Sequence, residues 1–166
     1  MLLPLKTIDL GNFENGEFLK DLKKIIAIPS ESQTEEGLIH CGRYLDEIMK
    51  PTFCNMGFDI KIFQNPIEGF GPVLLATRIE NPSLPTILGY GHGDVVRGMT
   101  GQWDHGREPW TISVDGERVY GRGTADNKSQ HWINMISMKN VLETRGALGF
   151  NAKFLIETGE ENGSLG

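Results

Sequence analysis

The chain has 166 residues, of which 39% are hydrophobic and 23% are charged, a composition typical of one globular domain and not of a fibrous or disordered chain. The net charge of −6 argues against nucleic acid or an anionic membrane as a partner, because both require a basic patch. No apolar run approaches a membrane span, and residues 1–6 lack the pattern of a secretory signal. We therefore predict a cytoplasmic protein in which Cys41 and Cys54 are reduced.

Two helical patterns occupy the first part of the chain. Apolar residues recur with helical spacing over 18–26, and Pro29 interrupts that pattern. A second stripe runs over 38–56, where Pro51 is expected to kink or split the helix. The sequence thus predicts two amphipathic helices before the first strand.

Strand and helix patterns alternate in the rest of the chain. Residues 58–62 alternate like a half-exposed strand, and the continuous apolar runs 72–79 and 86–90 are typical of central strands. Further along lie a β-hairpin over 111–120 that turns at Asp115-Gly116, a third helix over 132–142 and a buried strand over 152–157. This order predicts an α/β domain with a mixed, mainly parallel central sheet flanked by helices.

His92 and Asp94 stand two residues apart, where the apolar run 86–90 gives way to a loop. Side chains two apart in extended backbone share a face, so the imidazole and the carboxylate can converge. A neutral imidazole is a good zinc ligand, and a carboxylate that accepts its other ring N–H fixes the tautomer. The alternative is a structural, hydrogen-bonded histidine near a strand end.

Two further polar clusters follow a predicted hairpin and a predicted strand. Asp126 comes after glycine-rich backbone and can bridge two cations, although Asp126 or Asn127 can instead cap the helix that follows. Glu160 and Glu161 follow the buried strand, where adjacent carboxylates repel unless a cation or a proton compensates. Adjacent side chains point apart, which suits one metal ligand and one base. A solvated turn is the alternative.

Other chemistries find little support in the sequence. The glycines at 89, 91 and 93 lack the spacing of the dinucleotide-binding fingerprint, and Asn127 stands where a Walker loop requires glycine before its lysine. No serine occupies a nucleophile elbow, and neither cysteine has an evident base partner. Metal-assisted hydrolysis is the chemistry that remains.

Four motifs in order resemble the dinuclear zinc peptidase and deacylase family, which includes acetylornithine deacetylase, succinyl-diaminopimelate desuccinylase, aminoacylase, carnosinase-type dipeptidases and glutamate carboxypeptidase. The motifs are GHGDVV at 91–96, a tryptophan followed by Pro109-Trp110, YGRGTADNKS at 120–129 and ETGEENGS at 157–164. The segment that begins at Ile28-Pro29-Ser30 also resembles the start of the family, so the likeness covers nearly the whole chain. It implies a zinc exopeptidase-like catalytic domain.

The resemblance implies two zinc ions, for which cobalt or manganese can substitute. It makes His92 a ligand to one zinc, Asp126 a bridge between the two and Glu161 a ligand to the second. It makes Asp94 the carboxylate that orients His92, and Glu160 the general base that deprotonates metal-activated water. The implied activity is hydrolysis of an amide bond in a small peptide or an N-acyl amino acid.

The chain departs from the family pattern at several positions. Ser129 stands where the family usually has glycine, and Asn127 where it often has an acid. The chain ends at Gly166, before the family's further acidic ligand, its last histidine, and its lid and dimerisation domain. We therefore expect residues 1–166 to be the N-terminal portion of the catalytic domain, inactive on its own, and the full-length form to be a homodimer. A truncated, non-catalytic homologue that folds, or binds a metal or partner without turnover, is the alternative.

Three histidines have no place in these motifs. His40 and His131 fall on predicted helices and are expected to be structural or surface residues. His105 lies in the loop with Trp103 and Trp110 and is a candidate for the mouth of the site.

Overall fold

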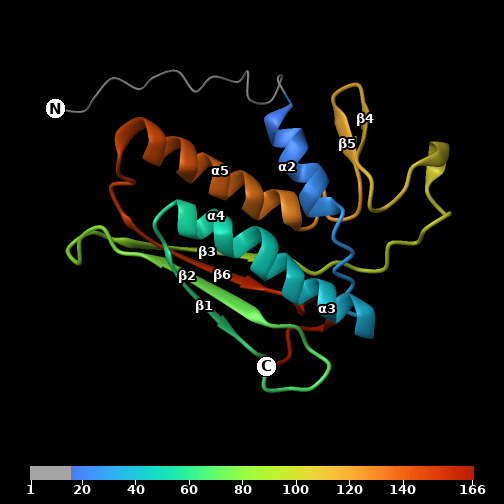
Figure 1. Cartoon of the computed structure of the whole chain (residues 1–166), viewed down its shortest axis with the longest axis horizontal. Coiled ribbons are helices and arrows are strands. Elements are labelled where there is room, and N and C mark those ends of the chain that lie inside the picture. Colours follow the sequence, from blue (N-terminus) through green and yellow to red (C-terminus); the bar gives the residue numbers. More distant parts are fainter. Residues whose placement is uncertain (1–15) are drawn as a thin grey trace.

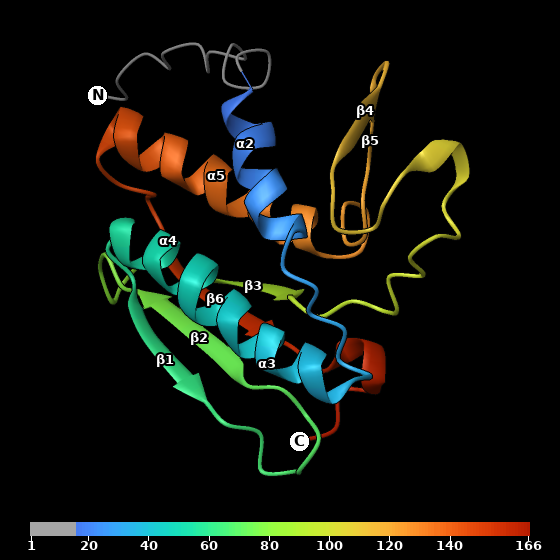
Figure 2. The same cartoon turned by 45° about the vertical axis from the view of Figure 1, so that its right-hand side comes forward.

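The structure, a computed structural model, describes residues 16–166 as a four-stranded sheet with helices packed on one of its faces (Figure 1; Figure 2). Residues 1–6, on which the prediction about a secretory signal rests, lie outside the described residues. No helix in the described part of the chain is long and apolar enough to cross a membrane. Cys41 and Cys54 are both free, as predicted.

The two amino-terminal helical predictions are confirmed. The first helix is α2 (Glu17–Ile26), and the second stripe becomes a helical run of three segments, α3 (Glu35–Arg43), a π-helical stretch η1 (Tyr44–Met49) and α4 (Lys50–Asn55). Pro51 is the second residue of α4, at the point where the π-helical stretch η1 ends. The wider π turn directly before it absorbs the interruption.

The sheet is mixed, with strand order β1-β2-β6-β3. Its strands are β1 (Asp59–Phe63), β2 (Val73–Arg78), β3 (Thr86–His92) and β6 (Asn151–Glu157). The pairs β1–β2 and β2–β6 are antiparallel and β3–β6 is parallel, so the expectation of a mainly parallel sheet is wrong for the described strands. Parallel neighbours need a crossover, usually a helix, and only the β3-to-β6 connection contains one, α5 (Lys128–Arg145).

A separate hairpin precedes α5. Its strands are β4 (Ser113–Asp115) and β5 (Arg118–Tyr120), which confirms the predicted hairpin. Gly116 takes a φ of 57° in the turn, a left-handed conformation that glycine adopts without strain. A short helix, η2 (Asp104–Gly106), lies in the loop before it. His105 is exposed on η2.

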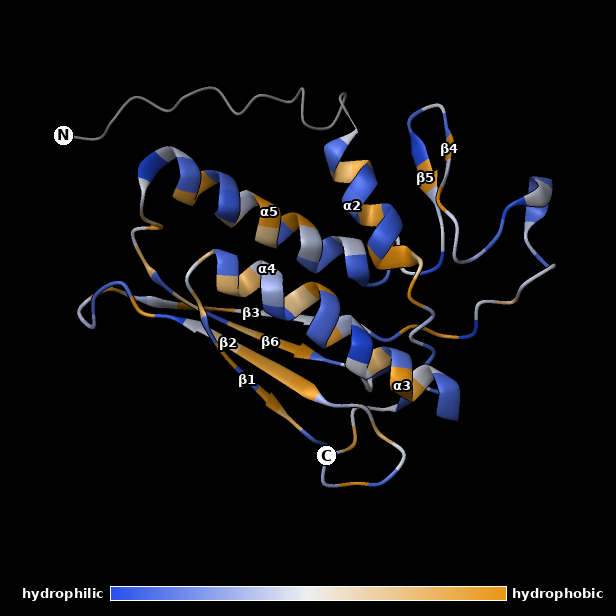
Figure 3. Ribbon diagram, in the orientation of Figure 1, coloured by the Kyte–Doolittle hydropathy of each residue, from blue (hydrophilic) through white to orange (hydrophobic). Residues whose placement is uncertain are grey.

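The core lies between the helices and the sheet. Figure 3 shows hydrophobic residues along β1, β2 and β6 beneath the helical layer. Burial of apolar surface on this scale is the main stabilising contribution to such a fold. The buried members of the core are Ile25, Ile28, Tyr44, Leu45, Met49, Phe53, Met56, Phe58, Leu74, Ala76, Trp132, Met135, Met138, Leu148, Ala152, Phe154 and Ile156.

β3 lies at the edge of the described sheet and not at its centre, contrary to the expectation for 86–90. Leu88 is 66% exposed and Tyr90 50% exposed, although the apolar run resembles a fully buried strand. On the helical face, the register pairs Gly89 with Phe154. A continuous apolar run therefore did not distinguish a central strand from this edge.

Replacing Gly89 by alanine is expected to lower the free energy of unfolding by about 1–3 kcal/mol, the usual effect of overpacking. A Cβ at position 89 would collide with the Phe154 ring, so the ring or the backbone would have to shift. Gly42→Ala in α3 is the matched control, since its Cβ would meet nothing within 4 Å and alanine favours the helix by about 0.5–1 kcal/mol. Chemical denaturation decides, and equal effects of the two substitutions would contradict the packing argument.

Candidate metal centre

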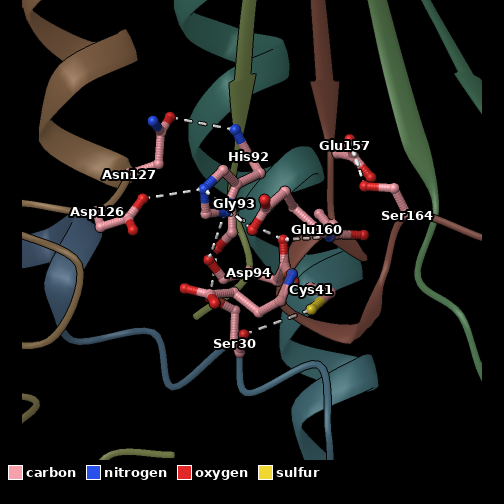
Figure 4. A network of polar contacts seen from close by, with 12 residues as sticks. Ser30, Cys41, His92, Gly93, Asp94, Asp126, Asn127, Glu157, Glu160 and Ser164 are labelled. Carbon is pink, nitrogen blue, oxygen red and sulfur yellow. Dashed lines mark hydrogen bonds and ion pairs between the residues drawn. The ribbon is translucent and has the colours of Figure 1, made fainter. Parts of the chain in front are cut away.

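The polar clusters predicted from the sequence meet where β3 and β6 end side by side (Figure 4). The parallel register places His92 opposite Glu157 at the carboxyl ends of the two strands. The Gly93 N–H donates to the Glu157 carbonyl oxygen at 2.8 Å, which continues the pairing into the loops. In open α/β sheets this edge is the usual place for a ligand site.

His92 is buried and faces a carboxylate on each side of its ring. Its Nδ1 lies 3.4 Å from Asp94 Oδ1 and 3.2 Å from the Asp94 carbonyl oxygen. Its Nε2 lies 3.1 Å from Asp126 Oδ1 and 3.7 Å from Glu160 Oε2. Burial acts to lower the pKa of His92, but the hydrogen bonds and charge of Asp94 outweigh it and raise that pKa to about 9.

Asp94 is fully buried and joins the loop after β3 to the turn after β6. Its Oδ1 accepts the Glu160 N–H at 3.3 Å and its Oδ2 accepts the Glu161 N–H at 3.0 Å. Burial acts to raise the pKa of Asp94, but the hydrogen bonds from His92 and from the Glu161 backbone hold it below the usual value. Asp94 therefore stays ionised beside His92.

Glu160 and Glu161 begin the short helix η3 (Glu160–Asn162) directly after β6. The Gln33 side chain donates to the Glu161 carbonyl oxygen at 3.0 Å and holds this turn against the loop before α3. Burial, followed by the charges of Asp126 and Glu160, raises the pKa of Glu161 against the opposite effect of His92. These contacts argue against the alternative of a freely solvated turn.

Asp126 lies in the loop before α5 and directs its carboxylate toward His92, although 70% of that side chain is exposed. Asn127 is the N-cap residue of α5, but neither it nor Asp126 makes a side-chain cap hydrogen bond there. The Asn127 Oδ1 instead accepts the His92 N–H at 3.2 Å. The helix-cap alternative is therefore wrong for this pair.

The donor set suits a zinc ion. One ligand atom each from His92, Glu160 and Glu161 lie within 4.8 Å of one another, and imidazole nitrogen with carboxylate oxygen is a usual zinc environment. Within residues 16–166, His92 is the only ion-pair partner of Asp94, Asp126 and Glu160. A cation would compensate the negative charge that one imidazole leaves unbalanced.

All five residues predicted for the site come together, namely His92, Asp94, Asp126, Glu160 and Glu161. Sequence reasoning missed Asn127, Tyr44 and His131, which lie directly behind them. His131 is buried on α5, which agrees with the prediction of a structural residue and not with that of a surface residue. No local sequence pattern could show that Tyr44 contacts His131, which lies 87 residues further along the chain.

Comparisons with known proteins agree with this geometry. Residues 88–166 match Peptidase family M20/M25/M40. The chain is 41% identical over 99 residues to the Beta-Ala-His dipeptidase of Mus musculus, covering 57% of this chain and 19% of that protein. It is 32% identical over 168 residues to the Cys-Gly metallodipeptidase DUG1 of Candida albicans, covering 90% of this chain and 33% of that protein. The solved structure of the di-peptidase Dug1p from Saccharomyces cerevisiae matches with a TM-score of 0.80 and 26% identity, over 93% of this chain and 34% of that one.

The mixed sheet with its helical layer has the fold of peptidase catalytic domains. The match of residues 88–166 to this peptidase family, together with the dipeptidase relatives, confirms the resemblance read from the motifs. The chain spans about a third or less of the length of these relatives.

Proposed function

We propose that the chain supplies catalytic and metal-binding residues of a zinc-dependent amide-bond hydrolase. The observation that carries this is the convergence of His92 with four carboxylates at the ends of β3 and β6. Relatives named dipeptidase and metallodipeptidase support the reaction class. The same relatives favour a dipeptide substrate, with an N-acyl amino acid as the related chemistry.

Two zinc ions are the proposed cofactors, with cobalt or manganese as substitutes. His92 would hold one ion through Nε2, Glu161 would hold the second, and Asp126 would contact both. When bound, zinc polarises the scissile carbonyl and makes water more acidic near neutral pH. Asp94 accepts a hydrogen bond from the Nδ1–H of His92, which leaves Nε2 available as a ligand.

Glu160 is the proposed general base. Its backbone N–H is fixed by Asp94 at 3.3 Å, and its carboxylate reaches within 3.7 Å of His92 Nε2 while the side chain stays 44% exposed. It is therefore held at the site yet open to water and substrate. In this role Glu160 takes a proton from the attacking water and returns it to the leaving amine.

The substrate, the oligomeric state and the location of the whole protein are the remaining parts of this proposal. A small peptide or acylated amino acid is the proposed substrate, and a homodimer and a cytoplasmic location stay predictions. The free thiols of Cys41 and Cys54 support a reducing compartment. The acidic net charge of −6 supports the expectation of no nucleic-acid partner.

The test is hydrolysis of Cys-Gly, β-alanyl-histidine and an N-acetyl amino acid by the zinc-loaded full-length form, with release of the free amino acid measured. We expect hydrolysis of at least one dipeptide, loss of activity with a chelator and recovery with added zinc. A full-length form that binds zinc but hydrolyses none of these substrates would replace the proposal with the non-catalytic alternative.

Zinc affinity is expected to rise about tenfold for each pH unit up to about pH 9, hence about 100-fold from pH 6 to pH 8. Zinc must displace the proton on His92, whose pKa is raised to about 9, so metal and proton compete throughout this range. Competition against a chelator with a known pH profile measures the slope. An affinity independent of pH would show that His92 is not displacing a proton when zinc binds.

A further inference from the structure

A buried chain of hydrogen bonds runs behind His92. The Tyr44 hydroxyl on η1 lies 2.5 Å from Nε2 of His131 on α5. The His131 Nδ1 lies 3.0 Å from the Asn127 Oδ1, which also accepts the His92 backbone N–H at 3.2 Å. Tyr44 and His131 are 0% and 1% exposed, so no solvent competes for these contacts. The elements η1 and α5 are thereby linked to the end of β3.

The direction of each hydrogen bond follows from the chemistry of the groups. A backbone N–H can only donate, so the Asn127 atom that faces His92 is the amide oxygen. That oxygen can only accept, so His131 donates from Nδ1, and its Nε2 accepts the Tyr44 O–H. Burial lowers the pKa of His131 to about 3, which agrees with a neutral ring that donates once and accepts once.

The two glycines beside His92 make this arrangement possible. A Cβ at Gly91 would lie 2.8 Å from the His131 Nδ1 and 2.7 Å from its Cβ. A Cβ at Gly93 would collide with the Tyr44 ring. The backbone on either side of His92 therefore packs directly against the two hydrogen-bonded rings. The Gly91-His92-Gly93 sequence has a packing reason that metal chemistry alone does not supply.

We propose that Tyr44 and His131 are positioning residues of the metal centre, which act through Asn127 to fix the His92 backbone and the adjoining Asp126. Within the described residues, no hydrogen bond joins either ring to the ligand atoms. Asn127 connects the two sides of the site, because its side chain holds His92 and its backbone adjoins Asp126. The part of this inference that concerns zinc rests on the proposed function, whereas the part that concerns the backbone of His92 does not.

The experiment uses the whole chain and three substitutions, Tyr44→Phe, His131→Leu and His131→Gln. Tyr44→Phe removes one hydroxyl, His131→Leu removes both ring contacts, and His131→Gln keeps one donor and one acceptor. Two quantities are measured for each variant: amide hydrogen exchange at His92, and zinc affinity by chelator competition.

We expect faster exchange at the His92 amide in Tyr44→Phe and His131→Leu. In both variants the Asn127 side chain, which accepts the His92 N–H, is held less firmly by residue 131. Zinc affinity should fall about 10- to 100-fold in His131→Leu, the usual effect of removing a partner of a metal ligand, and less in Tyr44→Phe. His131→Gln should recover part of both quantities. A role in packing alone would not predict recovery by this polar substitution.

Met135→Leu is the matched control, since Met135 is buried one turn further along α5 and belongs to the apolar core. It should leave His92 exchange and zinc affinity unchanged, whatever it does to the stability of the fold. If His131→Leu does not fold, Tyr44→Phe decides, because it changes a single oxygen atom.

Unchanged His92 exchange in folded Tyr44→Phe and His131→Leu would overturn the inference. So would a zinc affinity within twofold of the native value in both variants. If the native chain binds no zinc at all, the proposed function fails, and His92 exchange, which needs no metal, still decides the positioning role.

Discussion

In the full-length form, Glu160→Gln is expected to lower the rate of dipeptide hydrolysis by about 100- to 10,000-fold while zinc stays bound, the range typical for loss of a general base. Glutamine keeps the size of the side chain and removes its ability to take a proton. The backbone N–H of residue 160 can still donate to Asp94, so the turn should keep its position. Steady-state kinetics and metal analysis of the same sample give both quantities.

Glu161→Gln is the matched partner, and it should lose zinc. The two glutamates are neighbours in η3, and a carboxylate oxygen of each lies within 4.8 Å of the ligand atom of His92. Proximity alone does not separate the base from the ligand. Loss of zinc in Glu160→Gln, with zinc retained in Glu161→Gln, would exchange the two proposed roles.

Local patterns predicted the elements of the fold because each is a property of a short stretch. Helical spacing located α2 and the run from α3 to α4, and Pro51 marked its division. The hairpin of β4 and β5 followed from its turn residues. None of these predictions required knowledge of a distant residue.

Strand order and direction were not predictable in the same way. The run at 86–90 has the composition of a central strand, yet β3 lies at the edge of the described sheet. The antiparallel insertion of β2 between β1 and β6 depends on which faces are buried together, and that is decided by tertiary packing. Apolar content alone carries no information on direction.

The candidate site likewise contains residues that were predictable from the sequence and residues that were not. His92, Asp94 and the Glu160-Glu161 pair were predictable because each follows an apolar strand, and the ends of β3 and β6 meet in the fold. The hydrogen bond behind these residues was not predictable, because it joins η1 to α5 through two side chains that the helical patterns do not single out. Periodicity places His131 on a helix but does not show that its ring meets a tyrosine.

Asp94→Asn is expected to weaken zinc binding about 10- to 100-fold and to lower the free energy of unfolding by about 1–3 kcal/mol. Both carboxylate oxygens of this fully buried side chain accept a backbone N–H, from Glu160 and Glu161. Asparagine offers one oxygen and one NH₂ group, so one of those N–H groups would face a donor. The lost charge should also move the pKa of His92 from about 9 down toward its usual value.

Asp126→Asn provides the control for Asp94→Asn. The Asp126 side chain is 70% exposed and contacts His92, so this substitution should weaken zinc binding but change the free energy of unfolding by less than about 0.5 kcal/mol. Chelator competition, denaturation and an NMR titration of the His92 ring separate the two variants. If Asp94→Asn proved as stable as Asp126→Asn, the buried carboxylate would not be what fixes the glutamate turn to β3.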